Sequence, residues 1–185
     1  MQYPDQFSYF ARLIRVVDGD TIEVELDLGL RIYHKAFIRF YGVDTPEMNR
    51  KPQREAAEAA TAVLDRMVEL YRDNPTQSHI YDGRIYVQAL DFDKYANRII
   101  GMVYFPGFKL SLNGFLVRNG LAKVYGQGTW TGKRLAAVSA NAAAMLRTID
   151  ADTTSRGLAK IWAKGAGEAF VDVPQDIRAS EFGVN

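Results

Sequence analysis

The amino-acid sequence predicts an α+β domain in which a five-stranded β-barrel packs against three α-helices. Three observations support this prediction. Residues 7–41 contain three stretches rich in β-branched and aromatic residues, separated by short turns. The hydrophobic period changes to that of a helix over residues 52–72 and again over residues 133–149. Strand-like segments return between these two helical stretches, so strands and helices share one domain.

The first three predicted strands follow one another through short connections. Residues 7–17 read as the first strand, and Asp18-Gly19 is a tight-turn signal. In the second, Ile22, Val24, Leu26 and Leu28 alternate with polar residues, which predicts a strand with one buried face. Gly29 then turns the chain into a third strand, residues 31–41. The sequence therefore predicts a meander of three strands.

The rest of the chain alternates between helical and extended patterns. Pro52 suits the first turn of a helix that Asn74-Pro75 ends. The other predicted elements are strands at 77–91 and 98–105, a short helix at 111–119 and an alanine-rich helix at 133–149. Five strands interrupted by a helix after the third are compatible with a small closed barrel of the OB type. We expect one domain over residues 1–164 and a weakly ordered C-terminal extension over residues 165–185.

The composition limits the classes of protein to consider. Of 185 residues, 48% are hydrophobic and 24% are charged, as in a globular domain, and no apolar run approaches the roughly 20 residues that cross a bilayer. The chain has no cysteine, which excludes disulfides and thiolate metal sites. Its net charge of +1 is too small for a protein that grips long stretches of duplex DNA. The N-terminal residues do not resemble a secretory leader, so a cytoplasmic location is expected unless a leader has been removed.

The stretch from Lys35 to Glu47 carries the strongest chemical signal. A strand bearing Arg39 breaks at Gly42, and Asp44, Thr45 and Glu47 follow at once. An arginine fork matches phosphate oxygens, one carboxylate can ligate a hard cation, and a second can activate water. An ordinary strand exit with solvated charges is the competing interpretation.

Two further clusters fit the same chemistry. Asp20, in Asp18-Gly19-Asp20-Thr21, is expected to approach Asp44, so that two carboxylates and a backbone carbonyl face one cation. Between the fourth and fifth strands, Asp93-Lys94-Tyr95-Ala96-Asn97-Arg98 offers a second arginine for a phosphate clamp, with a cation and a stacking ring beside it. Taken alone, each cluster is also compatible with a polar hairpin turn.

Other nuclease chemistries are not supported by the sequence. His34 and His79 are isolated from acidic or asparagine neighbours, so a histidine-metal nuclease is not indicated, and both are expected at the surface or barrel rim. No lysine has an acid two positions before it, which excludes a restriction-type site, and no glycine loop of the phosphate-cradling kind is present.

In this order, the motifs resemble the staphylococcal nuclease (thermonuclease) family. The resemblance is carried by Asp18-Gly19-Asp20-Thr21, residues 38–47 (IRFYGVDTPE), Asp93-Lys94-Tyr95 with Arg98, residues 116–124 (LVRNGLAKV) and Ile161-Trp162. It runs from about residue 10 to 164. It implies an OB-fold barrel with packed helices and Ca²⁺-dependent hydrolysis of phosphodiester bonds in DNA and RNA.

The resemblance also implies a role for each matching residue. Asp20, Asp44 and the Thr45 carbonyl would bind Ca²⁺, Glu47 would act on the attacking water, and Arg39 and Arg98 would hold the phosphate. The substrate-contacting residues would be Lys94, Tyr95 and Tyr125.

Three features depart from the family pattern. Ala96-Asn97 adds one residue before Arg98, the loop from Glu47 to Pro52 is short, and Tyr125 matches the family's late tyrosines only loosely.

A Ca²⁺-dependent, sequence-tolerant nuclease is therefore the leading hypothesis. We expect a monomer that acts on DNA or RNA, prefers single strands and has no membrane partner. The alternative is an OB-fold module that lost catalysis and binds single-stranded nucleic acid or a protein. Such a module should have lost some of the five residues Asp20, Arg39, Asp44, Glu47 and Arg98, and all are present. A purely structural domain leaves the coincidence of motifs unexplained.

Overall fold

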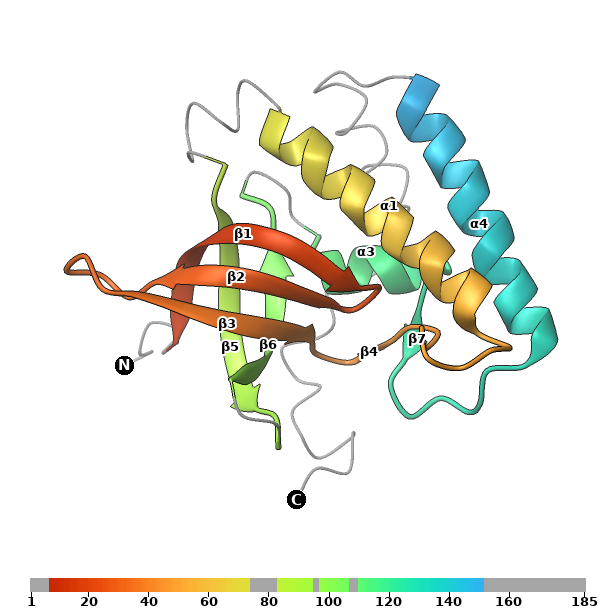
Figure 1. Cartoon of the computed structure of the whole chain (residues 1–185), viewed down its shortest axis with the longest axis horizontal. Coiled ribbons are helices and arrows are strands. Elements are labelled where there is room, and N and C mark those ends of the chain that lie inside the picture. Colours follow the sequence, from red (N-terminus) through yellow and green to blue (C-terminus); the bar gives the residue numbers. More distant parts are fainter. Residues whose placement is uncertain (1–6, 74–82, 95–96, 107–109, 152–185) are drawn as a thin grey trace.

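The computed structural model describes residues 7–73, 83–94, 97–106 and 110–151. Within them, five strands form a closed barrel with three helices gathered at one end (Figure 1). This architecture confirms the predicted α+β class and the OB-type barrel. The predicted extension at 165–185 and the motif at Ile161-Trp162 lie outside the described residues, as do His79 and Tyr95.

The barrel strands are hydrogen-bonded in the order β1-β2-β3-β6-β5, with β5 closing onto β1. Their bounds are Ser8–Asp18 for β1, Thr21–Asp27 for β2, Tyr33–Phe40 for β3, Ile85–Phe92 for β5 and Arg98–Tyr104 for β6. All pairs are antiparallel except β3 and β6, which are parallel. The predicted meander is therefore correct only for β1 to β3. Closure removes the exposed sheet edges that would otherwise need protection.

Alternation along the strands fills the barrel interior. Every second residue of β2 and β3 is buried, and these interior side chains are Ile22, Val24, Leu26, Ala36, Ile38 and Phe40. Each fully buried side chain of valine or larger size contributes about 1.5–3 kcal/mol relative to an exposed one. The residues between them face outward, so the exterior of β3 is where polar side chains gather.

Two predicted strand boundaries and the predicted burial of Leu28 were wrong. The strand expected at 77–91 begins at Ile85, after Gly83 with a φ of 63°; residues 77–82 lie outside the described residues. Leu90 is exposed because the β5–β6 register shifts between Ala89 and Asp91. Leu28 is exposed because β2 ends at Asp27, whose carboxylate accepts the Gly29 N–H at 2.9 Å. The turn then runs through Leu30 and Arg31, both at positive φ, so β3 starts two residues later than expected.

The three helices agree with their predicted positions to within two residues. They are α1 (Arg54–Asp73), α3 (Leu112–Arg118) and α4 (Gly132–Ala151). Helix α1 packs on β1 and on α4, while α3 packs on β6 (Figure 1). The apolar stripe of α1 is buried over its whole length, and that of α4 is buried except for the partly exposed Met145.

Short segments attach the helices to the barrel. Ser111 caps α3 by accepting the Gly114 N–H at 3.1 Å. The Tyr71 ring of α1 stacks on Phe105 just beyond β6, with ring centroids 4.1 Å apart, and its hydroxyl donates to the Arg84 carbonyl at 2.8 Å. A two-stranded sheet of β4 (Val43–Asp44) and β7 (Lys123–Val124), which the sequence did not predict, joins the end of β3 to the segment after α3.

None of the described helices is long and apolar enough to cross a membrane.

Candidate active site

Asp20 lies at the centre of the site, in the turn between β1 and β2. Its carboxylate is buried and accepts from the Thr45 backbone N–H at 3.1 Å and from the Thr45 hydroxyl at 3.0 Å. It also forms an ion pair with Arg39 and accepts from the Thr21 hydroxyl at 3.2 Å. One carboxylate therefore joins the first turn of the barrel to the end of β3 and to the segment that follows it.

Two glycines make this approach possible. A Cβ at Gly19 would lie 3.0–3.1 Å from the side-chain atoms of Thr45, so only glycine lets the β1–β2 turn sit so close to it. Gly42 has a φ of 70° and turns the chain from β3 into β4. The strand exit that the sequence predicted at Gly42 therefore carries Asp44 and Thr45 back toward Asp20.

Asp44 is held from the opposite side by Lys123. The two residues face each other across the β4–β7 pair and form an ion pair. Lys123 also lies over the Trp130 ring, 5.3 Å from its centroid. The sequence analysis gave Lys123 no role, although it lies in the stretch 116–124, because the contact joins residues 79 apart in the chain.

Glu47 is exposed in the loop between β4 and α1. Its backbone N–H donates to the Gln53 side chain at 2.9 Å, and its carbonyl accepts from Arg50 N–H at 3.3 Å. Gln53 is buried, so it ties this short loop to the start of α1. The backbone of Glu47 is therefore held by hydrogen bonds, whereas its side chain is exposed, so that a water molecule can reach the carboxylate.

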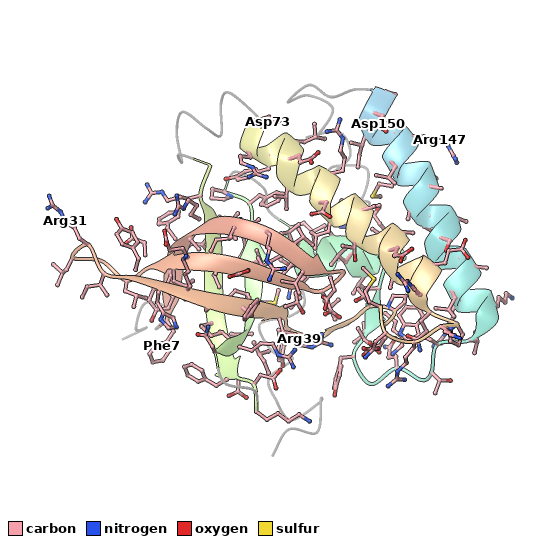
Figure 2. The ribbon with its side chains drawn as sticks, viewed as in Figure 1. Phe7, Arg31, Arg39, Asp73, Arg147 and Asp150 are labelled. Carbon is pink, nitrogen blue, oxygen red and sulfur yellow. The ribbon has the colours of Figure 1, made fainter. Side chains whose placement is uncertain are left out.

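Arg39 and Arg98 lie on neighbouring parallel strands. Phe37 is opposite Arg98 and Arg39 is opposite Ile100. The two arginines therefore point to the same outer face of the barrel and are displaced by two residues along the strands. Figure 2 shows Arg39 near the end of β3. Arg98 is ion-paired through Nε with Asp93, at 2.6 Å.

The extra residue before Arg98 is accommodated by Asn97. Asn97 adopts a φ of 65°, a conformation that asparagine tolerates better than most residues, and its carbonyl accepts the Phe37 N–H at 3.0 Å. The Asp93 N–H donates to the Arg98 carbonyl at 2.9 Å, which closes the hairpin. The insertion therefore leaves Arg98 on the β6 ladder beside β3.

Asn113 of α3 fixes the corner of the barrel behind the site. Its side-chain oxygen accepts the Val103 N–H at 3.0 Å, and its side-chain nitrogen donates to the Tyr41 and Gly101 carbonyls at 3.0 and 3.1 Å. The residue is fully buried. It satisfies three backbone groups where β3 leaves the barrel, which makes it a positioning residue that sequence reasoning missed.

The predicted substrate-contacting residues are dispersed. Lys94 is exposed in the β5–β6 hairpin, and Tyr95 lies outside the described residues. Tyr125 follows β7 with half its surface exposed, and its N–H donates to the Gly42 carbonyl at 3.0 Å. Tyr125 therefore borders the Asp44 side of the site, and Lys94 borders the Arg98 side.

The electrostatics of the site are dominated by the burial of Asp20. Burial raises the pKa of its carboxyl to about 6, against the opposing effects of the Arg39 charge and the Thr45 hydrogen bonds; nearby Asp18 reinforces the increase. A group with such a pKa gains or loses a proton close to neutral pH.

The donor set is compatible with a hard cation. Asp20, Asp44 and the Thr45 carbonyl are oxygen donors, and the hydrogen bonds of Asp20 to Thr45 place the first of them beside the segment that carries the other two. Within the described residues, no group of three or more His, Cys, Asp or Glu side chains converges as a metal site. A cation bound there would therefore take two carboxylates, one carbonyl and water, and would compete with Arg39 and Lys123 for the carboxylates.

Comparison with known proteins agrees with this geometry. A search of curated proteins found no match. Residues 37–145 match the model of a protein family described as staphylococcal nuclease homologue, and they cover β3 to most of α4 with Arg39, Asp44, Glu47 and Arg98. The match spans more than half of the chain. The chain therefore belongs to the staphylococcal nuclease homologue family.

Proposed function

We propose that this protein is a Ca²⁺-dependent, sequence-tolerant nuclease that hydrolyses phosphodiester bonds of DNA or RNA. The observation that carries the proposal is the contact of Asp20 with Thr45 and Arg39, which places a buried carboxylate and an arginine beside the segment that carries Asp44. The family match supports a nuclease-type domain and a nucleic-acid substrate.

The residues divide the reaction between them. Arg39 and Arg98 hold the phosphate from the outer face of β3 and β6, and they stabilise the charge that gathers on its oxygens as the transition state forms. Glu47 takes the proton of the attacking water, whose oxygen bonds to phosphorus as the ester P–O bond breaks. Lys94, Tyr95 and Tyr125 contact neighbouring phosphates or bases.

The cation has a defined place in this proposal. Asp20 and Asp44 with the Thr45 carbonyl would hold Ca²⁺, which supplies positive charge against the phosphate. Arg39 and Lys123 balance the same carboxylates in the present structure. We expect them to release part of that contact when the cation binds.

The test is hydrolysis of single-stranded DNA by purified protein, with Ca²⁺ or with excess chelator. Activity should require Ca²⁺, because the donors are oxygen atoms and no cysteine is present to recruit a softer metal. Glu47→Gln should lower kcat by about 10²–10⁴-fold with the fold intact, since an amide keeps the shape and cannot accept the proton.

Glu58→Gln is the matched control. Glu58 is exposed on α1 and forms an ion pair with its helix neighbour Arg54, away from the site, so its substitution should leave kcat unchanged. Full activity in chelator would exclude the metal, and a Glu47→Gln variant within twofold of the parent would remove Glu47 from the mechanism.

The same assays test the alternative, a module that binds without cleaving. It is favoured by one observation: both candidate metal carboxylates are neutralised by cations of the chain itself. Binding of single-stranded DNA with no Ca²⁺-dependent cleavage would establish that alternative.

A further inference from the structure

The barrel opens into an apolar pocket at the end away from Asp20. The pocket has a volume of about 600 Å³, within the range of small-ligand sites. The strands place it there: Leu26 lies near the end of β2 and His34 near the start of β3, whereas Asp20 directly precedes β2 and Arg39 lies near the end of β3. Nothing in the proposed catalytic mechanism uses this pocket.

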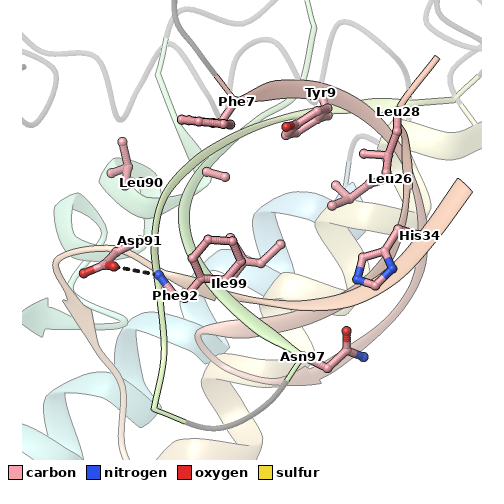
Figure 3. Close-up of a pocket in the computed structure, with 11 residues that line it drawn as sticks. Phe7, Tyr9, Leu26, Leu28, His34, Leu90, Asp91, Phe92, Asn97 and Ile99 are labelled. Atoms are coloured by element: carbon pink, nitrogen blue, oxygen red, sulfur yellow. Dashed lines mark hydrogen bonds between the residues drawn. The ribbon is translucent and has the colours of Figure 1, made fainter. Parts of the chain in front are cut away.

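Aromatic rings surround the opening. Figure 3 shows Phe7, Tyr9 and Phe92 around it, together with the imidazole of His34 and the amide of Asn97. Phe92 is 80% exposed and Phe7 is 64% exposed, so two ring faces beside the pocket are open to a ligand. Leu26 and Ile99 are buried and line its inner part. The site thus combines ring faces for stacking with a few polar groups, among them the exposed carboxylate of Asp91, which accepts the Phe92 N–H at 2.7 Å.

The β5–β6 hairpin connects the pocket to the phosphate clamp, which consists of Arg39 and Arg98. Phe92 ends β5, Asn97 lines the pocket, and the next residue, Arg98, belongs to the clamp. The outer face of β3 connects the two ends: Lys35, Phe37 and Arg39 alternate with the buried Ala36, Ile38 and Phe40.

The two glutamates of β2 beside this path are ion-paired. Glu25 lies opposite Lys35 and Glu23 lies opposite Phe37, and each is ion-paired with an arginine of β1, at 2.8 and 2.7 Å respectively. The path from the pocket to Arg39 therefore offers cations and one aromatic ring to a polyanion, without an uncompensated acid on the neighbouring strand.

We infer that the barrel-mouth pocket is a nucleobase subsite, which stacks an unpaired base of the same strand whose phosphate Arg39 and Arg98 hold. This inference rests on the proposed nucleic-acid substrate. Stacking on exposed rings is the usual way to hold single strands without reading their sequence. The five residue-to-residue steps from His34 to Arg39 span about 16 Å at 3.3 Å per residue. That is about five nucleotides at the B-form rise, and fewer for an extended strand.

The test compares a long and a short substrate. A fluorescent 12-mer of thymidylate is titrated with the full chain in chelator, so that binding is measured without hydrolysis. Stacking of one base is worth about 1–3 kcal/mol, so Phe92→Ala should weaken binding by about 5- to 150-fold. With Ca²⁺, KM for the 12-mer should rise by a similar factor, while cleavage of a thymidine dinucleotide, too short to reach the pocket, should not change.

Matched variants identify the interaction. Phe92→Trp should retain affinity and Phe92→Leu should lose it, because base stacking needs a ring whereas an aliphatic or protein occupant does not. Leu30→Ala removes a side chain that is 95% exposed in the adjacent hairpin and does not line the pocket, and it should leave binding unchanged. Because Phe92 is exposed, these variants should keep the parent melting temperature.

Failure of this inference is distinguishable from failure of the nuclease proposal. Wild-type affinity in both Phe92→Ala and Phe7→Ala, or in Phe92→Leu, would overturn the nucleobase subsite even if Ca²⁺-dependent cleavage is found. Equal losses on dinucleotide and 12-mer would overturn it too, since Phe92 would then act at the clamp. Ring-dependent binding without any cleavage would support the subsite and contradict the nuclease.

Discussion

At the scale of single residues, the pKa of Asp20 is set by two opposing influences. Its burial favours the protonated carboxyl, and its contacts with Arg39 and Thr45 favour the carboxylate. The balance leaves the pKa of Asp20 raised to about 6. The proposed binding of Ca²⁺ requires the carboxylate, so protons and Ca²⁺ would compete for this side chain.

The first prediction follows from that competition. Below pH 6, the apparent Kd for Ca²⁺ should rise by up to about tenfold per pH unit, the limit for one competing proton, and it should level off above pH 7. Isothermal titration calorimetry across pH 5–8 measures both the affinity and the proton released. A pH-independent Kd with no proton release would contradict the assignment of Asp20 as a ligand.

Titration of Asp20 should also change the stability of the fold without metal, and here the protonated form is the stabilising one. The folded state holds a proton on Asp20 between the ordinary pKa of 3.8 and the raised value of about 6, where the unfolded chain does not. This contribution to the free energy of unfolding is present below pH 3.8 and is lost as the pH rises through 6. Urea denaturation in chelator should therefore show it in wild type and not in Asp20→Asn; identical pH profiles would contradict it.

The two arginines provide a second prediction. Arg39→Lys and Arg98→Lys should each lower kcat far more than KM rises, because an ammonium group cannot reproduce the planar, two-pronged contact that strengthens in the transition state. Steady-state kinetics on single-stranded DNA measures both constants. Arg12→Lys, on the outer face of β1, is the control, and its kcat should not change.

If Arg98→Lys left kcat unchanged while Arg39→Lys lowered it, Arg98 would not hold the phosphate and would act through its ion pair with Asp93. The one-residue insertion before Arg98 would then have removed it from the clamp, in spite of its place on the β6 ladder.

At the scale of elements, the site depends on the corner where β3, β6 and α3 meet. Asn113 closes this corner by hydrogen bonds to two strands, and the Tyr41 N–H reinforces it by donating to the Gly101 carbonyl at 2.9 Å. Beyond this corner the β4–β7 pair, the ion pair with Lys123 and the hydrogen bonds of Thr45 to Asp20 hold Asp44 in place. The position of Asp44 is therefore coupled to α3 through the corner that Asn113 closes.

We predict that Asn113→Leu lowers the free energy of unfolding by about 3–5 kcal/mol. It removes the Asn113 contacts of the Val103 N–H and the Tyr41 carbonyl, whereas the Gly101 carbonyl keeps the Tyr41 N–H, and each unsatisfied group costs about 1–3 kcal/mol. Asn141→Leu is the matched control, because Asn141 is exposed and makes one long contact, of 3.3 Å, to the Gly120 carbonyl. Its effect should stay within about 0.5 kcal/mol. Urea denaturation measures both, and equal effects would show that the buried network does not stabilise this corner.

At the scale of the whole molecule, the small net charge limits how nucleic acid is held. With a net charge of +1, binding must depend on local cations, and the proposed path offers Arg39, Arg98, Lys94 and Lys35. Contacts to phosphate carry no sequence information, so low specificity is expected. A footprint of four cations is smaller than that of a large operator-binding protein.

The corresponding prediction is a shallow salt dependence with a preference for single strands. At about 0.7 counterions per phosphate, three or four contacts give a slope of log K against log salt of about −2 to −3. Stacking needs unpaired bases, so kcat/KM should be higher on single-stranded than on duplex oligonucleotides of the same sequence. A salt series with both substrates measures this, and a steep slope with duplex preferred would require a basic surface other than the one described.

The sequence by itself determined the features that depend on neighbours in the chain. The strand carrying Arg39, its break at Gly42 and the acids at Asp44 and Glu47 lie within nine residues, so alternation and turn chemistry were enough to predict them. The helical stripes of α1 and α4 were predictable for the same reason. Predicted strand boundaries were wrong where residues with positive φ moved them, as at Arg31 and Gly83.

Only the tertiary structure decided which distant segments meet. Alternation says which face of a strand is buried, but it does not identify its partner, so the parallel pairing of β3 with β6 could not be read from the pattern. The Lys123–Asp44 ion pair and the Asn113 network join residues 79 and 72 positions apart. The aromatic pocket exists because barrel closure brings Phe7 and Phe92, from opposite ends of the barrel sequence, to one opening.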